Sequence, residues 1–200
     1  MPREAESATD LYPSAGKRSS FARWLGATLG RWFVRVTPGE SWGETWDLGG
    51  KIGKHAQASF FREHPNKDYH LEREIELLNP VTPVDVFVSN TGELVTLDNW
   101  NNRGYGAVLV LYRADGKLVR SYKLSDLFTK KEIGSFPMSV SSISWHNGPT
   151  YINADQKTFY MSYHEPPDYR ELLLNLASGS VRFRASVTTY HCWMLEKVKQ

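Results

Sequence analysis

The sequence contains little of what several common protein classes require. A single Cys among 200 residues excludes an internal disulfide framework and a multi-Cys zinc site. No apolar run reaches about 18 residues, so no membrane-spanning helix is expected. The 24 Lys and Arg residues nearly balance 22 Asp and Glu residues, giving a net charge of +2. Because nucleic-acid binders usually concentrate positive charge, we expect no nucleic-acid partner.

The motifs of phosphate, metal and acyl-transfer chemistry are missing too. Segment 49–54 has three Gly and two Lys but lacks the G-x-x-x-x-G-K-[ST] frame. His55, His64 and His70 match no zinc-ligand spacing, and no G-x-S-x-G elbow is present. We therefore predict no cofactor and no metal site, and we assign no catalytic residue. Whether the protein is an enzyme stays open, with a non-enzyme favoured.

The chain is rich in aromatic residues, with 7 Trp, 10 Tyr and 9 Phe. Residues 1–20 lack apolar periodicity and are expected to form a disordered arm. Residues 17–35 carry five basic and no acidic side chains, and Phe21, Trp24 and Leu25 follow helical spacing. We expect a disordered arm and short helix over 1–30. The helix either packs on the domain or lies on an anionic membrane surface.

From residue 31 to 200 the pattern predicts one mainly β domain of antiparallel meanders. Two hairpins are indicated at 84–97 and 106–124, with turns at 90–92 and 114–116 where Gly permits a positive φ. Residues 32–78 are expected to be a less regular β region. Ser125 and Thr129 are predicted to cap two short helical turns, the second with the T-x-x-E capping box.

An internal repeat organises this domain. A shift of 64 residues places residues 87–122 over 151–186 without a gap, and apolar positions and turns coincide. Each copy is predicted to form strand–turn–strand–loop–strand–turn–strand, giving repeats near 84–124 and 150–186.

The segments SNTGELVTLDNW…GAVLVLYRADGKLVRSYKL and NADQKTFYMSYH…ELLLNLASGSVRF resemble blades of β-propellers of the surface-layer, NHL and quinoprotein-like kind. Stretches at 78–88, 96–100, 104–106 and 139–147 also resemble an uncharacterised bacterial family. This resemblance implies an incomplete propeller with two clear blades, and it brings no known activity. A compact sandwich and ring completion by a partner chain are the alternatives.

Two loops carry the densest mixture of polar and aromatic residues. Such side chains suit a sugar or a peptide, and the oxygens of the first loop would also suit Ca²⁺. The competing interpretation is structural: Asx side chains cap a tight turn, and Trp100 fills a gap between sheets. Residues 141–146 are then a two-faced strand, with His146 either at the surface or satisfied in the core. The candidate ligand-binding residues are Asp98, Asn99, Trp100, Asn101, Tyr105, Trp145, His146 and Asn147.

The sequence favours a binding or scaffold module that recognises a protein partner or small ligand at these loops. One alternative is a glycosidase-like hydrolase using Glu44, Asp47, Asp98 or His146. Another is a subunit of a larger assembly, with oligomerisation open. No signal peptide or membrane-spanning helix is recognised, and the compartment stays open, with a soluble protein expected and the cytoplasm favoured.

Overall fold

The computed structural model describes residues 25–26, 31–40, 53–65, 68–100, 102–163 and 170–185. These residues form a mainly β protein of three four-stranded antiparallel sheets, which confirms the predicted fold class. Each sheet is a meander in which every strand pairs with its sequence neighbours. Within the described part of the chain, no helix has the length and apolar character needed to cross a membrane.

The first sheet has the order β1-β2-β3-β4. Its four strands show that the N-terminal β region is more regular than the sequence indicated. Leu25–Gly26 pairs with residues 33–34, so the helix prediction is wrong at these two residues. The rest of residues 1–30 lies outside the described residues. The strands are β1 (Leu25–Gly26), β2 (Trp32–Thr37), β3 (Gln57–Glu63) and β4 (Tyr69–Glu76).

The second and third sheets occupy the two segments of the sequence repeat, and their strands coincide closely under the shift of 64. Turn residues Gly92 and Gly116 have φ of 96° and 87°, as the hairpin prediction required. The second sheet contains β5 (Asp85–Val88), β6 (Leu94–Leu97), β7 (Leu109–Tyr112) and β8 (Leu118–Tyr122). The third contains β9 (Thr150–Ile152), β10 (Thr158–Tyr163), β11 (Arg170–Asn175) and β12 (Val181–Ala185).

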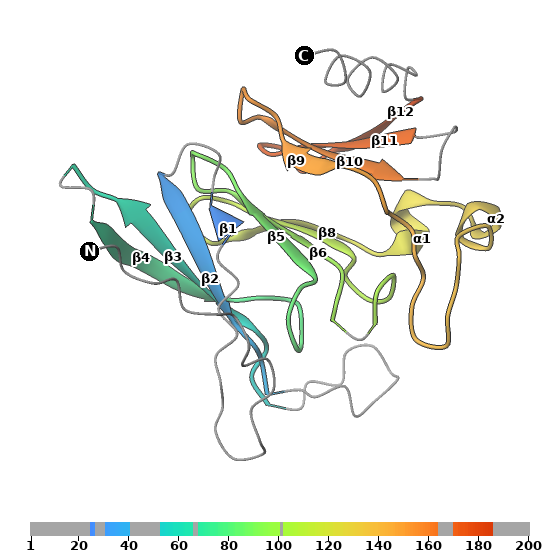
Figure 1. Cartoon of the computed structure of the whole chain (residues 1–200), viewed down its shortest axis with the longest axis horizontal. Helices are drawn as coiled ribbons and strands as arrows, with labels where there is room; N and C mark the ends of the chain where they lie inside the picture. Colours follow the sequence, from blue (N-terminus) through green and yellow to red (C-terminus); the bar gives the residue numbers. More distant parts are fainter. Residues whose placement is uncertain are drawn as a thin grey trace, which may run out of the picture.

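The β5–β8 sheet lies between the other two, and both of its faces are buried (Figure 1). One face packs Leu94 and Val110 against Trp32 and Phe60 of the first sheet. Alternate residues such as Val95 pack against the third sheet and the helices. Because successive side chains of a strand point to opposite faces, β6 and β7 are apolar nearly throughout. Their central position therefore follows from their sequence.

The first strands of the three meanders lie next to one another, since β5 contacts both β1 and β9. Side-chain bonds also join the turns of neighbouring sheets. Gln156 Oε1 accepts a bond from the Asn90 amide at 2.8 Å, and Tyr122 Oη donates to the Gly179 carbonyl at 2.5 Å. The second and third sheets are thus fixed to each other by hydrogen bonds as well as by apolar packing.

Two short helices, α1 (Leu124–Leu127) and α2 (Lys130–Ile133), follow β8. Thr129 caps α2 through the predicted capping box with Glu132. The cap of α1 is Lys123 rather than Ser125, so that prediction is wrong by two residues. Leu124 and Leu127 are buried in the cluster shared by the second and third sheets. The helices thereby close one end of that core.

The segment 139–148 is not a strand, which corrects the two-faced strand expected for 141–146. It is irregular, with one isolated bridge between Met138 and Ile143. Ile143, Trp145 and His146 are buried, whereas Ser144 is exposed. The backbone amide of Ile143 donates to the Arg103 carbonyl instead of a strand partner. This contact brings the segment onto the loop that follows β6.

Candidate functional site

Three connections converge on one site: the loop after β4, the loop after β6 and the segment before β9. Trp100 N donates to the Thr82 carbonyl at 2.9 Å, which joins the first two. Ile143 N donates to the Arg103 carbonyl at 2.8 Å, which joins the second and third. Residues from three parts of the sequence therefore meet through backbone bonds.

The side chain of Asp98 lies at the centre of this site and is fully buried. Its Oδ1 accepts bonds from Trp145 Nε1 and the Gly104 amide, both at 2.8 Å. Its Oδ2 is 2.9 Å from His146 Nε2 and 3.3 Å from Arg103 Nε. A buried carboxylate is stable only when its oxygens are paired in this way. The four donors therefore make Asp98 an internal anchor for both loops.

His146 is held on both sides and is only 5% exposed. Because Asp98 only accepts when ionised, His146 must carry a proton on Nε2. Arg103 Nη2 lies 3.2 Å from both ring nitrogens, so the guanidinium stands over the imidazole ring. The same Nη2 donates to the His146 carbonyl at 2.5 Å. Arg103 thus connects the Asp98 carboxylate with the ring and backbone of His146.

The backbone conformation at the loop is shaped around this anchor. Asp98 has φ of 54°, in the left-handed region that Asp tolerates better than most residues. Gly104 has φ of 82°, and a Cβ there would lie 2.6 Å from Ile143 Cβ. Only glycine fits both the conformation and the close approach of the two loops.

A second buried network secures the loop after β4 to the end of β6. Asn79 Nδ2 donates to the Asp98 carbonyl and to Asn99 Oδ1, both at 2.8 Å. Thr96 Oγ1 donates to Asn79 Oδ1 at 3.1 Å, and Asn99 Nδ2 donates to the Tyr105 carbonyl at 2.9 Å. Asn79, Thr96 and Asn99 are all buried. Their amide and hydroxyl groups satisfy one another and the loop backbone.

The structure brings together four of the predicted residues. Asp98, Trp145 and His146 meet in the first buried network, and Asn99 belongs to the second, which also holds the Asp98 carbonyl. The prediction that Trp100 fills a gap between sheets is wrong, because its side chain is 47% exposed. Trp145 fills such a place instead, at the core shared by the second and third sheets. Asn147 is exposed, Tyr105 is half-buried, and Asn101 lies outside the described residues.

Arg103, Gly104 and Asn79 belong to the site although sequence reasoning did not single them out. Arg103 and Gly104 stand within the polar-aromatic stretch 98–106, so their neighbourhood was a signal. Asn79 lies 19 residues from Asp98, and nothing in the sequence indicates that they meet.

The remaining candidate groups form no second centre in the described residues. His64 and His70 have ring centroids 4.3 Å apart, and His64 Nε2 is 3.4 Å from Glu72 Oε1. His55 Nδ1 faces the Leu77 carbonyl at 3.1 Å. No cluster of three His, Cys, Asp or Glu side chains suited to a metal occurs in the parts described. Glu44 and Asp47 of the hydrolase hypothesis lie outside them.

One ionisable group beside the site has a strongly altered pKa. Tyr112, at the end of β7, is buried against the first sheet, and its oxygen accepts a bond from the Leu78 amide at 2.7 Å. Burial disfavours the phenolate and raises the pKa of Tyr112 to about 12. Tyr112 thus supports the loop after β4 as a neutral hydrogen-bond acceptor.

A scan against protein-family models and a search of the curated proteins gave no match for this chain.

Proposed function

We propose that this protein is a non-catalytic, β-propeller-like binding or scaffold module. The observation that carries the proposal is the Asp98 network, which fixes two long loops at one end of stacked meanders while leaving other side chains of those loops exposed. Three successive four-stranded meanders with adjacent first strands are the arrangement expected of propeller blades.

The recognition surface would be the exposed part of these loops, here called the loop face: Trp100, Met138, Val140 and Asn147. Trp100 is 47% exposed, Met138 60% and Val140 92%. Exposed apolar side chains on a firmly held backbone favour contact with another protein, because little ordering is needed on binding. We propose a peptide segment of a protein partner as the ligand, with a sugar stacked on Trp100 as the competing outcome.

The same geometry supports binding rather than hydrolysis. A general acid or base must reach a substrate, usually within hydrogen-bond distance. Asp98 and His146 are buried, and His146 Nε2 and Asp98 Oδ2 already face each other in the network. Their chemistry serves to hold the loops.

The test is to probe peptide and glycan arrays with the purified chain and with Trp100→Ala and Val140→Ser variants. We expect binding to peptides that falls about tenfold in each variant, because each removes exposed apolar contact area. Lys131→Ala, on the separate helix α2, serves as the matched surface control and should bind normally.

Two results would overturn the proposal. One is array binding that both loop variants leave unchanged. The other is turnover of chromogenic glycosides or esters that disappears in His146→Gln while the variant keeps its circular dichroism spectrum. Binding to glycans alone, lost in Trp100→Ala, would contradict the assigned peptide ligand.

A further inference from the structure

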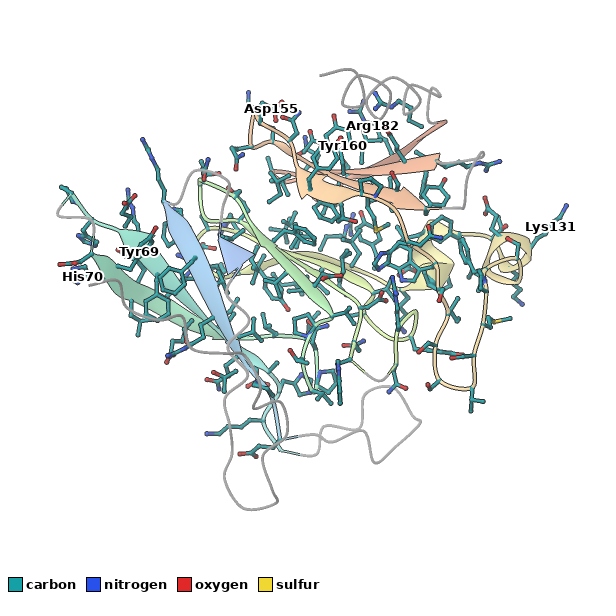
Figure 2. All side chains as sticks on the ribbon, viewed as in Figure 1. Tyr69, His70, Lys131, Asp155, Tyr160 and Arg182 are labelled. Atoms are coloured by element: carbon teal, nitrogen blue, oxygen red, sulfur yellow. The ribbon has the colours of Figure 1, made fainter. Side chains whose placement is uncertain are left out.

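The first and third sheets each have one face turned away from the central sheet. In the first sheet, Trp32 and Val34 point toward β5–β8, so the intervening Phe33 points outward. In the third sheet, Phe159 and Met161 point inward, so Tyr160 points outward. Figure 2 shows Tyr69 on the first sheet and Tyr160 and Arg182 on the third, at separate parts of the molecule.

The outward side of the first sheet, here called the β4 face, is aromatic with an acidic margin. Register places Phe33, Phe61 and Leu71 side by side across β2, β3 and β4. The Phe33 and Phe61 rings stack at 4.5 Å, and Leu71 is 52% exposed. Further along β4, Glu74 pairs with Ser59 on the same side. Arg35 of β2 also stands on this side, across from Ser59 and with its guanidinium over the Phe61 ring.

The outward side of the third sheet, here called the β12 face, is aromatic with a basic margin. Register places Tyr151, Tyr160, Leu173 and Arg182 side by side across β9 to β12. The two Tyr rings stack at 5.2 Å. Arg182 and Arg184 are exposed on β12, and Glu171 on β11 forms an ion pair with Arg184.

We propose that the β4 face of one copy of this chain packs on the β12 face of a second copy, so that two copies close a ring of six sheets. The inference rests on the propeller-like function proposed above. Closed propellers contain about four to eight blades. When a twofold axis relates the two copies, the contact between a β4 face and a β12 face occurs twice, and the six sheets form a closed ring. Aromatic side chains would meet aromatic side chains, and the acidic outer strand β4 would lie beside the basic outer strand β12.

Charge complementarity selects one orientation of the two copies relative to each other. Both Glu74 and Arg182 stand on outermost strands of their sheets and on outward sides. Stacking the two sheets as neighbouring blades places these outermost strands together at the rim. Each of the two contacts in the ring would then contain a Glu74–Arg182 pairing across the copies.

The experiment measures the mass of the purified 200-residue chain by analytical ultracentrifugation at about 1 to 100 µM. An interface of ordinary size should hold the dimer together within this range of concentration. We expect twice the chain mass of 22.9 kDa. Glu74→Arg and Arg182→Glu should each weaken association about tenfold or more through like-charge contact. The double variant restores opposite charges and should recover the dimer. Lys131→Glu, on α2, is the charge-reversal control and should leave the dimer intact.

A strictly monomeric chain at the highest concentration would overturn the inference, as would a dimer that both single reversals leave unchanged. Circular dichroism of each variant distinguishes lost association from lost folding. Leu71→Lys disrupts the β4 face without changing the Glu74–Arg182 pair and should also weaken the dimer. The mass is independent of the array experiment. A monomer whose loop face still binds peptide would refute ring closure while leaving the proposed function standing.

Discussion

At the scale of single residues, Asp98 has the largest share in holding the loops. One carboxylate accepts bonds from an indole, a backbone amide, an imidazole and a guanidinium. Removing such an acceptor leaves buried donors unpaired, and each unpaired group destabilises a fold by about 1–3 kcal/mol. Stability and site geometry are therefore coupled through this residue.

We expect Asp98→Asn to lower the free energy of unfolding by about 3 kcal/mol, since the amide cannot accept from all four donors. Asn tolerates the positive φ, so the loss reports the carboxylate rather than the backbone. Urea unfolding measures the effect. Asp155→Asn, in the exposed turn after β9, is the control and should change stability by less than about 0.5 kcal/mol. Equal stability of Asp98→Asn and the natural protein would contradict the anchoring role.

Gly104→Ala should destabilise the protein by about 2 kcal/mol or more, because φ of 82° is strained for Ala and the added Cβ would meet Ile143. Gly134 offers a matched comparison at the C-cap of α2, with φ of −67° and its nearest neighbour 3.4 Å from an added Cβ. Gly134→Ala should leave the melting temperature unchanged or slightly raised. Similar melting temperatures for the two variants would show that the close approach of the two loops does not contribute to the stability of the protein.

Tyr112 should make stability fall at high pH. Its pKa in the folded protein is about 12 against an ordinary value of 10.0, so the folded state retains a proton that the unfolded state loses. This contribution to the free energy of unfolding is complete below pH 10 and is lost as the pH rises to about 12, with a total of roughly 3 kcal/mol.

Tyr112→Phe should remove this part of the pH dependence, and at pH 7 it should lower stability by about 1 kcal/mol through the lost bond to Leu78. Denaturant unfolding at pH 8, 10 and 11 measures both effects. Tyr151→Phe, at an exposed tyrosine of β9, should keep the natural profile. If Tyr112→Phe lost stability at high pH as steeply as the natural protein does, the assignment of this pH dependence to Tyr112 would be wrong.

At the scale of secondary-structure elements, local signals explain which parts of the fold could be predicted. The hairpins around Gly92 and Gly116 were predictable, because strand alternation and a turn residue with positive φ lie within a few positions of each other. The cap at Thr129 was predictable for the same reason. The strand β1 was not, since two residues carry no periodicity, and its pairing depends on β2.

The candidate site shows the limit of such local signals. The polar-aromatic loop at 98–106 could be recognised from composition, but the bond from Trp145 to Asp98 spans 47 positions. Trp100 and Trp145 are both flanked by polar residues, and sequence alone does not indicate that one is exposed and the other buried. Which tryptophan enters the core depends on how the second sheet packs on the third.

At the scale of the whole molecule, the sheets differ in how much they depend on neighbours. In the described residues, the central sheet contributes side chains to both apolar clusters of the core, whereas each flanking sheet contributes to one. A sheet with one apolar face needs a partner layer to be stable. We therefore expect the flanking sheets to be the first to lose protection in hydrogen exchange, and the proposed dimer to slow their exchange more than that of β6 and β7. Exchange at 10 and 100 µM chain measures the difference, and equal slowing in all three sheets would argue against the assigned interface.

The strictly sequential pairing of strands also has a consequence for how the protein reaches its fold. Every sheet is assembled from contacts that are short in sequence, so each meander can form early and quickly. The bonds from Asp98 to Trp145 and His146 join segments nearly fifty positions apart and require two formed sheets. We therefore expect these bonds to form after the main folding barrier, where an interaction slows unfolding more than it speeds folding. On this view, weakening the Asp98 network should raise the unfolding rate and leave the folding rate nearly unchanged.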